Sequence, residues 1–181
     1  MTPEELNQLL KHIETEVKLR GFSKATIKTY RFYNKHFIEF INKHPDEVTE
    51  DDLKTYLAEK MNEDNLSAKS IGLIKSALLF YYNELKGNTF NIKTPKIKKT
   101  APVVLSKKEI EKLFSVIKNP QHKLMMQLFY ASGLRLSEAL HIRVRDIEFE
   151  EHILWVRGGK GGKDRMTILS RKLAKDLKQH C

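Results

Sequence analysis

Apolar residues recur every three or four positions through the first hundred residues, in four separate stretches. This spacing places them on one face of an α-helix, so each stretch predicts an amphipathic helix. A Ser or Thr that can cap a helix precedes each stretch. The four helices are expected to begin after Thr2, Ser23, Thr49 and Ser67. Their short connections predict a compact four-helix bundle.

Residues 86–102 break this pattern. The stretch reads KGNTFNIKTPKIKKTAP and has five lysines, two prolines and no carboxylate. Such a composition predicts an extended linker that buries no core. Its lysines suit contact with a phosphate backbone, and a solvated spacer explains the same composition.

After residue 103 the pattern mixes helical and strand-like periods. Further helices are expected after Ser106 and over residues 121–131, 136–142 and 171–181. Three β-rich apolar runs predict strands at residues 147–149, 153–156 and 166–169. The predicted fold class is therefore mainly α with a small antiparallel sheet (α+β), in which a four-helix domain precedes a domain with a three-stranded sheet.

Charge is uneven along the chain. The 181 residues carry 33 Lys and Arg against 23 Asp and Glu, a net charge of +10, and residues 101–181 hold +7 of this excess. The excess predicts a polyanionic partner, and nucleic acid comes first because each phosphate that Lys or Arg neutralises releases counterions. A soluble basic protein without such a partner is the alternative on charge alone.

Composition disfavours several other classes of protein. No apolar run approaches the roughly 18 residues that span a bilayer, and the acidic, amphipathic start differs from a signal or transit peptide. The one cysteine, Cys181, excludes an internal disulfide framework and a multi-cysteine zinc site. These features predict a cytoplasmic protein.

The string SGLRLSE at residues 132–138 suits anion binding. Gly133 can end one helix, which leaves Arg135 at the start of the next, where its fixed donors and the helix dipole can hold a phosphate. Ser137 and Glu138 are near enough along the chain to support that arginine. An ordinary surface arginine with a local salt bridge is the alternative.

A second string, RGGKGGKDR at residues 157–165, holds four of the eight glycines. Glycines at this density predict a tight hairpin tip, from which Lys160 has a long reach. The string is not a P-loop, because Arg157 stands where that motif needs its first Gly and Asp164 stands where it needs Ser or Thr. A basic hairpin without further role is the alternative.

The helical bundle, the basic linker, the two strings and the three strands, in this order, resemble the tyrosine recombinases, particularly their Xer-like and archaeal-type integrase branch. The resemblance covers essentially the whole chain and is best at residues 105–114, 131–140 and 144–165. It implies a SAM-like core-binding domain at residues 1–90, a basic linker at 91–102 and the front portion of the catalytic domain at 103–181.

The resemblance implies a reaction in which a tyrosine attacks a DNA phosphodiester and forms a 3′-phosphotyrosine, which a 5′-hydroxyl later resolves without a metal or other cofactor. Arg135 matches the arginine that stabilises charge on the scissile phosphate. Lys160 matches the hairpin lysine that protonates the leaving 5′-oxygen, and Lys163 is its rival for that role. Glu138 matches the acidic residue that supports the arginine.

The partner that the resemblance implies is double-stranded DNA, bound by a homo-oligomer that is a tetramer in the family. Neither a membrane nor a small-molecule cofactor is expected. Basic residues in the helical half, the linker and the hairpin are candidates for DNA contact. They are Lys24, Lys69, Lys96, Lys98, Lys99, Lys163 and Arg165.

The chain departs from the family pattern after the hairpin. The family continues with a His-x-x-Arg motif and the nucleophilic tyrosine, whereas the last of the six tyrosines here is Tyr130. A C-terminally truncated recombinase, inactive by itself, is the first hypothesis, with apolar surface uncovered near Leu169, Leu173 and Leu177. A non-catalytic DNA-binding regulator of recombination is the second. A basic domain for RNA or protein is the third, and the two strings in order argue against it.

Overall fold

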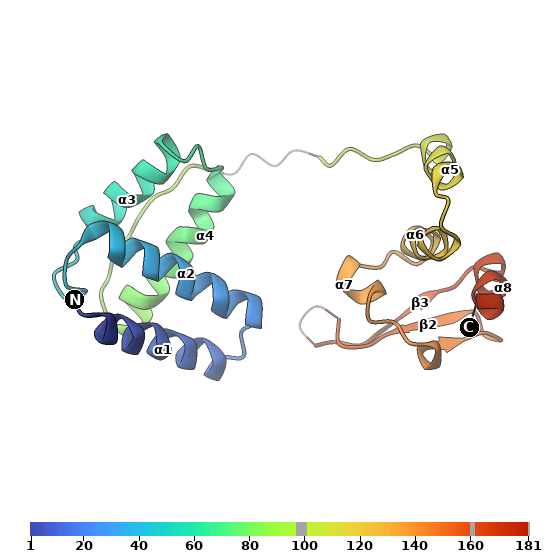
Figure 1. Ribbon diagram of the computed structural model, residues 1–181, viewed down its shortest axis with the longest axis horizontal. Coiled ribbons are helices and arrows are strands. Elements are labelled where there is room, and N and C mark those ends of the chain that lie inside the picture. Colours follow the sequence, from blue (N-terminus) through green and yellow to red (C-terminus); the bar gives the residue numbers. More distant parts are fainter. Residues whose placement is uncertain (97–100, 160–161, 181) are drawn as a thin grey trace. The chain divides into compact units, whose positions relative to one another are not determined.

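The structure, a computed structural model, describes residues 1–96, 101–159 and 162–180. Its contacts divide the chain into two units, Met1–Thr100 and Ala101–Cys181 (Figure 1). None of the helices in the described part of the chain combines the length and the apolar character that crossing a bilayer requires.

Local capping explains where the helices of the first unit begin. The hydroxyl of Thr2 accepts the backbone N–H of Glu5, and Ser23, Thr49 and Ser67 cap the next three helices in the same way. All four predicted starts are therefore confirmed. The helices are α1 (Pro3–Leu19), α2 (Lys24–Ile41), α3 (Glu50–Asn62) and α4 (Ala68–Leu79).

A short π-helix, η1 (Phe80–Leu85), continues α4. The backbone N–H of Lys86 donates to the carbonyl of Tyr81, five residues back, at 3.1 Å. Tyr82 in this wide turn is fully buried, and its ring centroid lies 5.9 Å from that of Phe37 in α2. The π-helix therefore contributes to the core of the first unit.

Among residues 1–96, the core of the first unit contains one buried polar side chain, Asn34. Its amide nitrogen donates to the carbonyls of Tyr30 and Ala77, both at 2.9 Å. Because Ala77 belongs to α4, the second bond ties α2 to α4 inside the apolar core. Around it, every helix contributes fully buried side chains, among them Ile13, Phe37, Leu53, Ile71 and Leu78.

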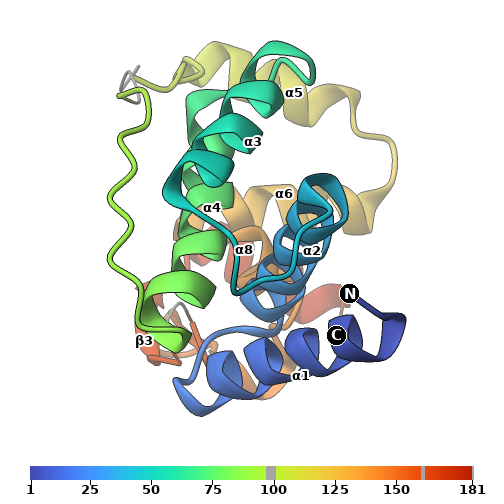
Figure 2. The same ribbon diagram turned by 90° about the vertical axis from the view of Figure 1, so that its left-hand side faces the viewer.

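Beyond Gly87 the chain turns back alongside α4 in an extended conformation (Figures 1 and 2). Ile92 in this stretch is only 6% exposed and belongs to the core of the first unit. Lys75 of α4 donates to the carbonyl of Ile92 at 3.3 Å and to the hydroxyl of Thr94 at 3.2 Å. The expectation that residues 86–102 bury no core is therefore wrong at Ile92, because side chains of the bundle hold the backbone there.

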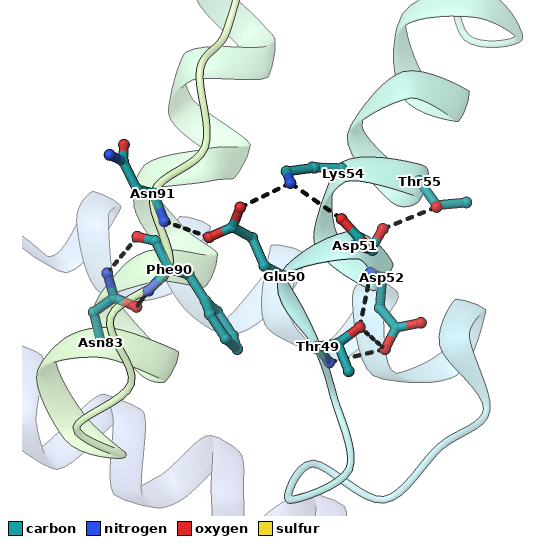
Figure 3. Close-up of polar contacts among 9 residues, drawn as sticks. All are labelled: Thr49, Glu50, Asp51, Asp52, Lys54, Thr55, Asn83, Phe90 and Asn91. Atoms are coloured by element: carbon teal, nitrogen blue, oxygen red, sulfur yellow. Dashed lines mark hydrogen bonds and ion pairs between the residues drawn. The ribbon is translucent and has the colours of Figure 1, made fainter.

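Residues 90–94, here called the docked segment, have two further polar anchors (Figure 3). The side chain of Asn83 forms two hydrogen bonds with the backbone of Phe90: it accepts the N–H at 3.1 Å and donates to the carbonyl at 2.9 Å. Glu50 at the start of α3 accepts the N–H of Asn91 at 2.7 Å. The bundle thus satisfies backbone groups of the docked segment much as a neighbouring strand would.

The second unit packs helices against one face of a three-stranded antiparallel sheet in the order β1-β2-β3. Ile147 pairs with Leu154, and Trp155 pairs with Met166. Leu154 and the other inward residues of β2 are buried against α6 and α8. The elements are α5 (Lys107–Val116), α6 (Pro120–Ser132), α7 (Leu136–Ala139), the 3-10 turn η2 (Val144–Asp146), β1 (Ile147–Glu148), β2 (Ile153–Val156), β3 (Arg165–Ile168) and α8 (Arg171–His180). The predicted mainly α fold with a small antiparallel sheet is confirmed.

Two expectations for the second unit are wrong. The helix expected over residues 136–142 is only the single turn α7, because the N–H groups of His141 and Ile142 bond carbonyls three residues back. Leu169 and Leu173 are buried instead of uncovered, and Leu177 packs against the same core. These leucines are covered because α8 lies against the sheet and α6 (Figure 1).

Candidate active site

Arg135 lies between two helices. α6 ends at Ser132, and its C-cap, Gly133, has a left-handed backbone (φ 57°) and donates its N–H to the carbonyl of Phe129 at 3.0 Å. Glycine adopts this conformation without strain, which permits the sharp exit from α6. Arg135 then occupies the N-cap of α7, and 57% of its side chain is exposed. Its guanidinium is therefore accessible to a ligand from solvent.

Glu138 is the buried anchor of this arginine, with 4% of its side chain exposed. Its Oε1 accepts Nη1 of Arg135 at 2.7 Å, and its Oε2 accepts the backbone N–H of Arg135 at 2.9 Å. Nη2 of Arg165 also donates to Oε2, at 2.8 Å. These bonds, first of all that from the Arg135 N–H, lower the pKa of Glu138 from 4.5 to about 2. Glu138 is therefore ionised at neutral pH.

Strand β3 is bonded to the loop at residues 133–135, between α6 and α7, here called the arginine loop, and to the end of α6 that precedes it. Ser132 Oγ donates to the carbonyl of Ile168, and Thr167 Oγ1 donates to the carbonyl of Ser132, both at 2.9 Å. Arg165 adds a bond from Nη2 to the carbonyl of Gly133 at 3.3 Å. These bonds join residues 32 to 36 positions apart and fix the end of the glycine hairpin beside the arginine loop.

The glycine hairpin between β2 and β3 starts beside Glu138. The N–H of Gly159 donates to the carbonyl of Lys163 at 3.0 Å. A Cβ added at Gly159 would lie 2.9 Å from that carbonyl oxygen and 3.3 Å from Oε1 of Glu138, so the hairpin and the carboxylate leave no room for a side chain. Asp164 closes the base of the hairpin by accepting the N–H of Gly158 at 2.8 Å.

A recess of about 510 Å³ opens between the arginine loop and the hairpin base. Arg157 lines it from the end of β2, where Nη1 lies 3.0 Å from Asp164 and the guanidinium stacks 4.7 Å from the ring centroid of Trp155. The lining residues are Arg135, Ser137, Glu138, His141, Arg157, Gly158 and Gly159. Two arginines on one recess suit an anion the size of a phosphate group.

The structure brings Arg135, Glu138 and Arg165 together, and the predicted support by Glu138 has a direct geometric basis. Ser137 lines the same recess, and its carbonyl lies 2.7 Å from Nδ1 of His141. The pairing of Glu138 with Arg165 has no local sequence signature, since 27 positions separate the two residues. The Arg157–Asp164 pair could have been found from opposite charges flanking the glycine run.

The remaining predicted DNA contacts fall into two groups. Some are exposed side chains in the described part of the chain, two of them in the first turns of α2 and α4. The exposed residues are Lys24, Lys69, Lys96 and Lys163. The predicted contacts that lie outside the described ranges are Lys98 and Lys99. The candidate general acid, Lys160, also lies outside them.

Two family models match this chain, one in its first half and one in its second half. The profile of the phage integrase N-terminal SAM-like domain matches residues 9–92, and that of the phage integrase family matches residues 103–181. The chain belongs to the phage integrase family of tyrosine recombinases. The resemblance to tyrosine recombinases is thereby confirmed for the helical first half and for the second half that contains the two strings.

A curated relative within the family is tyrosine recombinase XerA of Pyrococcus horikoshii, 35% identical over 176 residues. The match covers 96% of this chain and 60% of that relative, so the chain spans about three fifths of the relative's length. A XerH site-specific recombinase bound to a palindromic difH substrate, in a post-cleavage complex, gives a TM-score of 0.69 at 20% identity over 97% of this chain and 56% of that one. The Tn1549 transposon integrase in complex with transposon right end DNA gives 0.69 at 18% identity over 94% and 64%. These two structures establish the shared fold.

Proposed function

We propose that this chain binds double-stranded DNA and carries part of an active site for site-specific strand cleavage and rejoining. The observation that carries this proposal is the exposed guanidinium of Arg135, held by the buried carboxylate of Glu138 at the base of the hairpin that includes Lys160. Such an anchored, accessible arginine can stabilise charge that develops on a phosphate.

In the proposed reaction, a tyrosine hydroxyl attacks the phosphorus of a scissile phosphodiester, and Arg135 stabilises the charge on the non-bridging oxygens. The bond to the 5′-oxygen breaks, and Lys160, or its neighbour Lys163, gives that oxygen a proton. The 3′-phosphotyrosine is then attacked by a 5′-hydroxyl, which reforms the phosphodiester and releases the tyrosine. No tyrosine follows Tyr130, so the nucleophile comes from a segment outside residues 1–181.

Each of three parts of the chain has its own role in the proposed function. Residues 1–90 form the core-binding domain, residues 91–102 form a linker whose first residues are docked on that domain, and residues 103–181 form the front portion of the catalytic domain. Basic side chains in all three parts hold DNA phosphates, and the protein works on DNA as a homo-oligomer, a tetramer in its family. The candidate contacts are Lys24, Lys69, Lys96, Lys98, Lys99 and Lys163.

DNA binding is tested with this chain and a fluorescent duplex, by anisotropy between 50 and 200 mM salt. The affinity should fall linearly with salt on logarithmic axes, because binding releases counterions, and Arg135→Gln should lower the slope by about 0.9. Affinity that does not depend on salt would overturn the proposal.

Cleavage is tested after the chain is extended with the C-terminal part of Pyrococcus horikoshii XerA that lies beyond the matched region. The extended protein should trap a covalent adduct on a nicked duplex, and Arg135→Gln should slow adduct formation by about 100-fold or more. DNA binding without any adduct in the extended protein would instead support the non-catalytic regulator.

A further inference from the structure

Arg165 lies beside the proposed phosphate site but is turned toward the protein. It starts β3, and its Nη2 donates to Oε2 of Glu138 at 2.8 Å and to the carbonyl of Gly133 at 3.3 Å. Its side chain is 37% exposed, against 57% for Arg135. Two acceptors of the protein therefore already occupy this guanidinium nitrogen.

The charge balance at Glu138 explains why a second arginine is needed. The Arg135 guanidinium and the Glu138 carboxylate, 2.7 Å apart, form a neutral pair by themselves. Because the Glu138 carboxylate is buried, water screens its charge poorly. The negative charge of this carboxylate would therefore cancel much of the attraction between Arg135 and an incoming phosphate. With Arg165 also paired to Glu138, the three groups carry a net charge of +1.

We infer that Arg165 is a positioning residue that neutralises Glu138 and so leaves the charge of Arg135 available to a DNA phosphate. This inference rests on the proposed function, since it assigns Arg165 a role at the same site. It replaces the prediction that Arg165 itself contacts DNA. Glu138 orients Arg135 through two bonds, and Arg165 offsets the electrostatic cost of that support.

The strand that carries Arg165 is suited to this role. The bonds of Ser132 and Thr167 hold β3 against the arginine loop, so the guanidinium of Arg165 meets Glu138 without rearrangement of the backbone. The backbone N–H of Arg135 contributes most to the low pKa of Glu138, about 2, and the side chains of Arg135 and then Arg165 lower it further. Both oxygens of Glu138 are thereby occupied by donors of the protein.

A double-mutant cycle on duplex affinity separates this role from direct DNA contact. Arg165→Gln should weaken binding by roughly fivefold in the natural background, about the loss of one phosphate contact. In a Glu138→Gln background the same change should cost less than about twofold, because there is no carboxylate left to neutralise. An equal loss in both backgrounds would show that Arg165 contacts DNA on its own and would overturn the inference.

Two further variants serve as controls for this cycle. Arg165→Lys keeps a cation beside Glu138 and should stay within about twofold of the natural affinity. A loss as large as that of Arg165→Gln would contradict the inference. Arg171→Gln removes the same charge from the exposed start of α8, and it should change affinity by the same factor in both backgrounds. Unequal factors for this control would show that Glu138 couples to any nearby charge, which would also contradict the inference.

A readout without DNA distinguishes failure of the inference from failure of the proposed function. Carbon-13 NMR of the Glu138 carboxyl should show its pKa rising toward the ordinary 4.5 in Arg165→Gln and staying low in Arg165→Lys. An unchanged titration would overturn the inference even if the chain binds DNA. If the titration shifts but the natural chain shows no salt-dependent binding, the proposed function fails, and the part of the inference that concerns DNA fails with it.

Discussion

Two carboxylates in this chain form the same kinds of bond in different surroundings. Glu50 in the first unit accepts the N–H of Asn91 at 2.7 Å and pairs with Lys54 at 2.8 Å, with 32% of its side chain exposed. Glu138 in the second unit also accepts a backbone N–H and pairs with cations, but it is almost fully buried. Water can reach the carboxylate of Glu50 and replace its partners, whereas it reaches the carboxylate of Glu138 poorly. Burial, more than the number of bonds, therefore decides which carboxylate the structure depends on.

The strongest test of this comparison removes the buried carboxylate. Glu138→Ala should weaken duplex binding by about tenfold or more and lower the melting temperature, because Arg135 loses its support and two arginines lose a shared partner. Anisotropy and thermal melting measure the two effects. Glu50→Ala is the matched control, and a loss of affinity as large as that of Glu138→Ala would remove the distinction between the two sites.

Acid should also separate the two carboxylates. The pKa of Glu138 is depressed from 4.5 to about 2, so its contribution to stability is complete above pH 4.5 and disappears as the pH falls toward 2. The pKa of Glu50 is lowered as well, first by its bond to Lys54. We expect Glu138→Gln to flatten the dependence of the urea midpoint on pH between 5 and 2 more than Glu50→Gln does. Equal flattening in the two variants would contradict the comparison.

Release of the docked segment should lower the stability of the first unit by less than the loss of Glu138 lowers that of the second. Asn83→Ala removes both bonds to Phe90 and should cost the first unit roughly 1–2 kcal/mol. Hydrogen exchange should accelerate at the Phe90 N–H, and trypsin should cut faster after Lys93. Thr89→Ala, at an exposed neighbouring position, is the control and should leave both rates unchanged. Unchanged exchange at Phe90 in Asn83→Ala would show that burial of Ile92 alone holds the segment.

The smallest change is expected from Glu50→Gln. The Asn91 N–H should exchange a few times faster, on the order of threefold, while the melting temperature stays the same, because an exposed acceptor is readily replaced by water. Amide exchange by NMR measures this local effect. A cooperative loss of stability in this variant would place Glu50 in the same class as Glu138.

The helix starts could be predicted from the sequence because their cause is local. Thr2, Ser23, Thr49 and Ser67 each cap a helix through a bond to a residue three positions on, which a single stretch of sequence displays. The position of Arg135 at the start of α7 was predictable for the same reason, since Gly133 ends α6 two residues earlier.

What could not be predicted depends on contacts between distant parts of the chain. Ile92 lies in a lysine-rich stretch that reads as a linker, and only the side chains of Lys75 and Asn83 show why its backbone stays with the bundle. The contact between Arg165 and Glu138 likewise crosses from the hairpin to α7. Charge patterns along the sequence do not specify which of many arginines meets a given carboxylate.

The π-helix after α4 has a consequence for how the chain tolerates changes in length. A π-turn holds about one residue more than an α-turn, so deletion of a single residue within 80–82 would remove the surplus and let α4 continue as a regular helix. The residues beyond the turn would keep roughly their present facing. Insertion of a further residue into α4 before the turn would instead rotate Asn83 about the helix axis by roughly a quarter-turn or more, away from Phe90. The exit from the bundle should therefore tolerate a shortening of the sequence better than a lengthening.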